Sequence, residues 1–208
     1  MSRNSLMEAS IQNDLNKLEY ILSTKLLDIN EKCDNFQYTA LHYAAQNGHI
    51  HTMKLLLEHG ADINATEQCG FTALFFCTNF GYASCVQLLL DQDNMKVNHK
   101  YIDGQTAFER LLYTINKEER KEIKYSGEEI YNRQCNCIEL FLKNKKVLDF
   151  FVNNMDNINY SDVLYSKLKT LDQSDTCSLL KDQYKKMLDH FNKKYFYSHL
   201  QKSHGCLQ

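Results

Sequence analysis

Residues Tyr38–Ala65 read YTALHYAAQNGHIHTMKLLLEHGADINA, a sequence that meets the requirements of two short helices in succession. Thr39 can cap the first helix with its hydroxyl group, and Gly48 can end that helix in the left-handed conformation. The run Met53–Leu57 supplies the apolar face of a second helix, which Gly60 can end. The stretch therefore predicts a helix pair followed by a connection to a further unit.

The same pattern recurs along the chain. Thr39 is followed by Thr72 and Thr106, at separations of 33 and 34 residues. The second copy keeps a glycine between its helices, Gly81, and an apolar run in its second helix. The third copy begins at Thr106 but its second helix resumes only near Cys137, where CIELFL matches CVQLLL of the second copy. Self-similarity at such a period is the signature of stacked structural repeats.

These features resemble the ankyrin repeat, although alanine replaces the proline that the family uses after the capping threonine. Alanine is a good helix former, so the change is compatible with the fold. The resemblance implies an all-α solenoid of about five helix-turn-helix units with short β-hairpin turns and one long insertion in the fourth unit. The predicted units cover residues of about 4–33, 34–66, 67–100, 101–155 with the insertion at 115–132, and 156–192 as a degenerate cap, followed by a tail at 193–208.

The predicted insertion, INKEERKEIKYSGEEIYN, has nine charged side chains of both signs among its 18 residues. Charges of opposite sign at near-neighbour spacing suit a solvated helical extension with ion pairs along its surface. Two interpretations stay open for the segment: a tolerated surface insertion, or a contact specific for a partner.

Composition narrows the class of protein. The formal net charge is −2, which does not favour nucleic acid or an anionic membrane as a partner. The sequence has no run of about 18 apolar residues, and its start lacks the apolar core of a signal peptide. We therefore expect a cytoplasmic protein whose eight cysteines are reduced thiols, with the nucleus or a host cytosol as alternatives.

The resemblance also implies a function, because ankyrin proteins commonly bind other proteins through a concave face formed by the hairpins and first helices. The positions that the family places on that face, and that we predict to bind a partner, are Phe36, Tyr38, Tyr43, Gln46, Asn47, Phe71, Phe76, Asn79, Phe80, Gln105, Arg110 and Tyr113. Aromatic and arginine side chains are favoured as interface anchors. The aromatic strip is either an apolar binding groove, or Phe71 and Phe80 pack against neighbouring repeats or the insertion.

Candidate catalytic and metal-binding residues are few. The resemblance assigns His42 to the hairpin backbone, which it would bond and steady. Cys135 and Cys137 lie two apart on a predicted helix and so point to different faces, which does not suit a metal ion. His199, His204 and Cys206 could collect zinc, but no fourth ligand with suitable spacing accompanies them. We predict no catalytic site, no cofactor and no metal.

One modification follows from the resemblance. Asn64, within Asp62-Ile63-Asn64-Ala65, resembles the hairpin asparagine that a cytosolic oxygenase hydroxylates in ankyrin proteins. Such a mark would change stability and would not create an activity.

The sequence therefore favours a non-catalytic adaptor, inhibitor or targeting subunit that is monomeric on its own and binds a partner protein through its concave side. At the level of architecture it also resembles the IκB-like inhibitors and the ankyrin proteins that viruses or intracellular bacteria place in host cells. In an alternative interpretation, residues 143–208 form a separate module with an enzyme-linked or ubiquitin-ligase-recruiting role, and the repeats select its substrate. A third is a scaffold fragment of a larger assembly.

Overall fold

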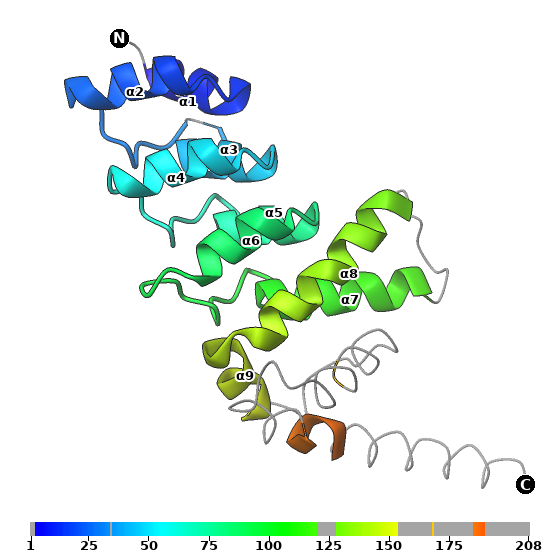
Figure 1. Cartoon of the computed structure of the whole chain (residues 1–208). Coiled ribbons are helices and arrows are strands. Elements are labelled where there is room, and N and C mark those ends of the chain that lie inside the picture. Colours follow the sequence, from blue (N-terminus) through cyan, green and yellow to red (C-terminus); the bar gives the residue numbers. More distant parts are fainter. Residues whose placement is uncertain (1–2, 34, 120–127, 154–167, 169–184, 190–208) are drawn as a thin grey trace, which may run out of the picture.

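The chain folds as a stack of antiparallel helix pairs, shown in Figure 1. A computed structural model describes residues 3–33, 35–119, 128–153, 168 and 185–189. The helices, in chain order, are α1 (Arg3–Gln12), α2 (Leu15–Thr24), α3 (Ala40–Gln46), α4 (Ile50–Glu58), α5 (Ala73–Asn79), α6 (Ala83–Leu90), α7 (Ala107–Glu119), α8 (Glu128–Lys143) and α9 (Lys145–Val152). The predicted all-α repeat fold is confirmed. Among the described helices, none combines the length and apolar character needed to cross a bilayer.

The threonines of the repeat pattern mark the starts of the first helices. Thr39 and Thr72 precede α3 and α5 in an extended conformation. At α7 the capping box is complete, because the Thr106 amide donates to Glu109 Oε2 at 2.8 Å and the Glu109 amide donates to Thr106 Oγ1 at 3.3 Å. The cap at Thr106 satisfies amide groups that a helix start leaves unpaired, whereas the Thr72 side chain makes no such bond to α5.

The hairpins between units are tight turns, and no strand is assigned to any residue in the described ranges. Backbone hydrogen bonds close them: the Glu67 amide donates to the Phe71 carbonyl at 3.0 Å, and the Tyr101 amide donates to the Gln105 carbonyl at 3.0 Å. The turn before α3 is closed in the same way, from the amide of Cys33 to the carbonyl of Tyr38 at 2.8 Å.

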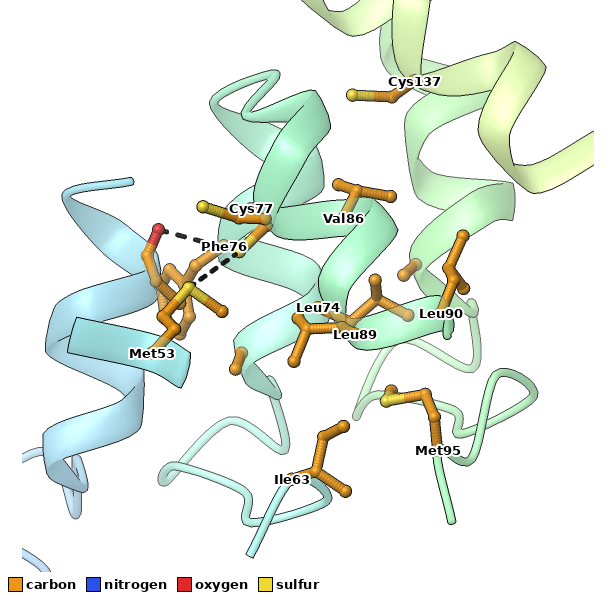
Figure 2. Packing of buried hydrophobic residues seen from close by; sticks show 14 of the residues in the cluster. Met53, Ile63, Leu74, Phe76, Cys77, Val86, Leu89, Leu90, Met95 and Cys137 are labelled. Atoms are coloured by element: carbon orange, nitrogen blue, oxygen red, sulfur yellow. Dashed lines mark hydrogen bonds between the residues drawn. The ribbon is translucent and has the colours of Figure 1, made fainter. Parts of the chain in front are cut away.

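A continuous apolar core joins the units. Ala44 and Ala45 are fully buried, and their small side chains let α5 pack closely on α3. Figure 2 shows this core from Met53 of α4 across Cys77 and Val86 to Cys137 of α8. Each described unit buries its apolar face against its neighbours, as stacked repeats do.

The fourth unit differs from the others because its helices are longer. Figure 1 shows α7 and α8 projecting beyond the ends of the preceding pairs. The helix α9 then follows α8 after a single residue, Asn144, whose side chain accepts from the Val147 amide and caps α9. Phe151 of α9 packs on Phe108, which also stacks on Phe141 of α8 with centroids 4.8 Å apart.

The predicted fifth unit lies mostly outside the described residues. Leu168 and Met187 are both buried. Its boundaries, the tail at 193–208 and the residues His199, His204 and Cys206 stay sequence predictions.

Candidate partner-binding surface

Aromatic rings from two consecutive units form one connected cluster. Tyr38 lies at its centre, with ring centroids 5.2 Å from Tyr43 and 5.3 Å from Phe76. Phe36 lies 6.0 Å from Tyr38 on the outer side. Phe76 in turn contacts Phe71 at 6.4 Å, edge to face. We call these five residues the aromatic cluster. The structure therefore brings together five of the predicted partner-binding residues.

The members of the cluster differ in exposure. Phe36 is 60% exposed, whereas Phe76 is only 6% exposed. Tyr38, Tyr43 and Phe71 are half-buried. Phe76 therefore supports the other rings from beneath and is not an accessible anchor, because Tyr38, His42 and Phe71 cover it. The position of Phe76 on its helix does not reveal this, since two of the covering rings, Tyr38 and His42, come from the preceding unit.

Two further rings extend the cluster. Phe75 stacks on Phe71 with centroids 3.9 Å apart and planes 11° from parallel. Tyr101 from the next hairpin meets Phe71 edge to face at 4.9 Å. Neither residue was among the predicted binding positions. The sequence does mark Phe75 as a departure from the repeat pattern, because it replaces the histidine that the preceding unit carries at this position. Phe71 thus packs partly against its neighbouring repeat.

Burial perturbs the hydroxyl groups at the cluster. Desolvation raises the pKa of Tyr43 to about 12, aided by a contact of 3.4 Å between its Oη and Cys33 Sγ. The pKa of Tyr38 is also raised, first by burial and then by the nearby carboxylate of Glu67. Glu67 is itself buried and accepts hydrogen bonds from the amides of Cys69 and Phe71 at 2.7 and 2.9 Å. Both tyrosines therefore keep their protons at neutral pH and can donate hydrogen bonds.

The remaining predicted residues lie beside the cluster. Arg110 pairs with Asp103 at 3.4 Å and lies over the ring of Tyr113 at 5.6 Å. Gln105, in the same unit, is half-buried. This group forms a second patch on the fourth unit.

Some of the predicted polar residues at the helix ends already make hydrogen bonds within the chain. Asn47 is exposed and its amide donates to the Tyr43 carbonyl at 2.8 Å, while Gln46 is half-buried. The Asn79 carbonyl accepts from Gln134 of α8, so α8 reaches this end of α5. Phe80 packs near Tyr82 with centroids 6.0 Å apart. Asn79 and Phe80 thus belong to the end of the stack that α8 partly covers.

His42 is a structural residue in this geometry. Its Nδ1 accepts from the Thr39 amide at 3.0 Å, and its Nε2 lies 3.0 Å from the Ala65 carbonyl and 3.2 Å from that of Phe71. Because Nδ1 accepts, Nε2 carries the proton and donates to these carbonyls. Burial lowers the pKa of His42 to about 4, so the ring is neutral at pH 7. Both nitrogens are used, which leaves none for chemistry.

The cysteines inside the stack are packing residues. Cys77 and Cys137 are fully buried, and burial raises the pKa of both thiols, that of Cys137 to about 12. A thiol in that state is a poor nucleophile and metal ligand. In the part of the chain that the structure describes, no three His, Cys, Asp or Glu side chains gather as a metal site.

Asn64 connects two units. Its Oδ1 accepts from the Lys96 amide at 2.8 Å, and its Nδ2 donates to the Asn94 carbonyl at 2.8 Å. Asn30 makes the corresponding bond one unit earlier, accepting from the Asp62 amide at 2.7 Å. Both polar atoms of the Asn64 side-chain amide thus make hydrogen bonds to the backbone of the next unit. That this residue is hydroxylated stays a proposal, and an intact mass of the cellular protein without one added oxygen atom would contradict it.

The fold and this surface define a helical repeat protein that carries an aromatic patch on its hairpin side. A family model described as ankyrin repeats, in three copies, matches residues 6–101. Ankyrin repeats are therefore shown over residues 6–101, and the stack as a whole is similar to the ankyrin-repeat family.

Several proteins are similar over part of the chain. A putative ankyrin repeat protein of Rickettsia bellii is 30% identical over 146 residues, which cover 64% of this chain and 59% of that protein. A probable E3 ubiquitin-protein ligase of Oryza sativa subsp. japonica is 42% identical over 67 residues, covering 32% of this chain and 13% of the ligase. A palmitoyltransferase of Lachancea kluyveri is 39% identical over 71 residues, covering 34% of this chain and 10% of the transferase. The chain thus spans only a small part of the two enzymes.

Proposed function

We propose that this protein is a non-catalytic interaction module that binds a partner protein through the aromatic cluster on its concave side. It would act by stoichiometric binding, as an adaptor, an inhibitor or a targeting subunit. The observation that carries the proposal is the connected set of rings around Tyr38, with Phe36 largely exposed at its edge. Large aromatic side chains bury much area for few rotatable bonds, which makes them effective anchors.

The chemistry of the surface supports binding over catalysis. Ankyrin repeats generally bind other proteins and are generally not catalytic. His42, the histidine beside the cluster, is neutral and has both nitrogens in hydrogen bonds. The tyrosines are protonated at neutral pH, so the phenolate form that a general base requires is not populated.

The cellular location, the oligomeric state and the class of partner can be proposed for such a module as well. We infer a cytoplasmic location, with reduced thiols, and a protein that is monomeric in the absence of its partner. A role in a host cell is a further candidate, supported by the similarity to a Rickettsia bellii protein. A slightly acidic chain is a poor fit for nucleic acid, because phosphate contacts require clustered cations.

In the alternative, residues 143–208 form a separate module whose substrate the repeats select. The similarity to a ubiquitin ligase motivates that idea but covers only 13% of the ligase. Within this region, α9 contributes Phe151 to the aromatic core around Phe108. The packing of α9 therefore favours a single stack at least as far as Val152.

Affinity capture from a cell lysate tests the proposed function. We would compare the wild type with Phe36→Ser, and use Tyr20→Ser as a matched control. Tyr20 is an aromatic residue of similar exposure, 63% against 60%, but it lies on α2, away from the aromatic cluster. Because both positions are exposed, neither change should alter thermal melting.

We expect a partner that wild type and Tyr20→Ser hold equally and that Phe36→Ser retains about tenfold less well, as for loss of one interface anchor. Equal capture by all three proteins would contradict a binding role for the aromatic cluster. It would place the site on the insertion or in the C-terminal region.

A further inference from the structure

Three hairpins present an exposed side chain at the same position of their turns. Phe36, Cys69 and Ile102 follow one another at intervals of 33 residues. Phe36 is 60% and Ile102 78% exposed, and Cys69 between them is exposed as well. The turns are aligned by backbone hydrogen bonds, from the Gln68 amide to the Phe36 carbonyl at 3.1 Å and from the Ile102 amide to the Cys69 carbonyl at 3.4 Å. We call these three residues the tip row.

The spacing of the tip row is set by helix packing. The helices α3, α5 and α7 behind the hairpins contact one another in sequence. Packed helices lie about 8–10 Å apart, so two steps along the stack cover about 16–20 Å. A ligand that places one side chain on each tip must repeat at this interval on a single face.

A strand, an α-helix and a polyproline II helix differ in the distance between successive residues on the same face. A strand returns to the same face after about 6.6–6.8 Å, which is too short. An α-helix places residues i and i+7 on one face at about 10.5 Å, so its second step, at about 21 Å, overshoots the row. A polyproline II helix has three residues per turn and rises about 3.1 Å per residue, which gives about 9.3 Å per step and about 19 Å for two. Only the last falls inside the interval.

Charge points to the same ligand. The side chains from Asn35 to Tyr38 and from Gln68 to Phe71 are uncharged and end in rings, amides, a thiol or hydrogen. The Glu67 carboxylate is buried beneath its turn. Asp103, next to the last tip, is paired with Arg110. A surface of this kind complements an uncharged segment. The cations near it, Lys32, Lys100 and Arg110, belong to different units and do not form the cluster that the phosphates of a nucleic acid would require.

The amide groups of the surface suit such a segment as well. The backbone of a polyproline II helix makes no internal hydrogen bonds, so its carbonyls face outward as acceptors. Gln37 and Gln68 are exposed beside the tips, and the Tyr38 hydroxyl is protonated. These groups can donate to the carbonyls while the rings pack on proline, as in aromatic-lined grooves that bind proline-rich peptides.

We propose that the partner presents an uncharged polyproline II segment with an apolar residue, typically proline, at every third position. The segment runs along the stack axis and places one such residue on each of Phe36, Cys69 and Ile102. This inference rests on the proposed function and specifies the part of the partner that the hairpin side recognises.

Selection from two displayed peptide libraries tests the proposal on the full chain. One library fixes proline at every third position with uncharged residues elsewhere. The other displays an uncharged amphipathic helix with leucine at every seventh position. Selected peptides are then measured for affinity against Phe36→Ser and Ile102→Ser. Tyr20→Ser and Leu26→Ser are the controls, because Tyr20 and Leu26 match the exposure of the two tips at 63% and 75% but lie outside the tip row.

The expected result is enrichment from the proline library, with affinity about tenfold weaker for both tip variants and changed by less than about twofold for both controls. Binders from the helical library alone, sensitive to the tip variants, would overturn the polyproline inference but leave the proposed function standing. Failure of both libraries would also overturn the inference, and the lysate capture would then decide the proposed function separately.

Discussion

The backbone of Arg133 passes directly over Gly81. A Cβ atom added at Gly81 would lie 2.5 Å from the Cβ of Arg133 and 2.8 Å from the amide nitrogen of Gln134. In the preceding unit, the atoms nearest to a Cβ added at the turn glycine Gly48 belong to the ring of Tyr82, at 2.9 Å. The longer α8 therefore docks on the α5–α6 turn with its main chain, and the guanidinium of Arg133 lies 5.7 Å from the centre of the Tyr82 ring.

Gly81→Ala should therefore lower the free energy of unfolding by about 2–4 kcal/mol. The left-handed conformation, with φ at +71°, accounts for about 1–2 kcal/mol, and the rest comes from displacing α8. Urea denaturation followed by circular dichroism measures the change. Gly60→Ala is the matched control, because Gly60 has φ at +91° and no atom within 4 Å of an added Cβ. Equal losses for the two variants would show that the contact with α8 adds nothing.

Acidification should destabilise the fold through His42. Its pKa is lowered from 6.5 to about 4 in the folded chain, so between these values the unfolded state binds more protons. The stability contributed by neutral His42 is complete above pH 6.5 and is lost as the pH falls towards 4, by about 3 kcal/mol in all. Urea denaturation at pH 4, 5, 6 and 7 measures this slope. In His42→Asn the slope should be shallower, and an unchanged slope would assign the effect to other groups.

Asn64→Ala should lower the free energy of unfolding by about 0.5–1.5 kcal/mol, because it removes two hydrogen bonds, to the Lys96 amide and the Asn94 carbonyl, whose exposed groups water can then solvate. The melting temperature of Asn64→Ala is compared with that of Asn98→Ala, since Asn98 is the exposed asparagine one repeat later. If both variants melt together, the bonds from Asn64 do not hold the units to each other.

Phe151→Ala should cost about 3–5 kcal/mol, as expected for a buried phenylalanine, because Phe151 packs on Phe108 in the last described core. Calorimetry should show one transition that moves to lower temperature as a whole. Two separate transitions, with only one displaced, would support a distinct C-terminal module. Phe150→Ala, on the neighbouring half-buried ring, should cost less.

The repeat fold could be predicted because its signals are local. Thr39, Thr72 and Thr106 immediately precede helices, and glycines follow them, at a fixed period in the sequence. The predicted aromatic strip also comes together around Tyr38. The burial of Phe76 could not be predicted, because the rings that cover it belong partly to the unit before. The docking of α8 on Gly81 depends on how far the helix extends past its usual start, which charge patterning alone does not fix.

The tip row also has a fixed length. Since α9 follows α8 after Asn144 alone, no hairpin separates them, and Ile102 is the last tip before that point. Within the described residues up to Val152, a longer ligand would need an additional unit inside the array. An engineered unit could be inserted between Ala65 and Glu67, where one repeat passes to the next. Each inserted unit would lengthen the tip row by one residue.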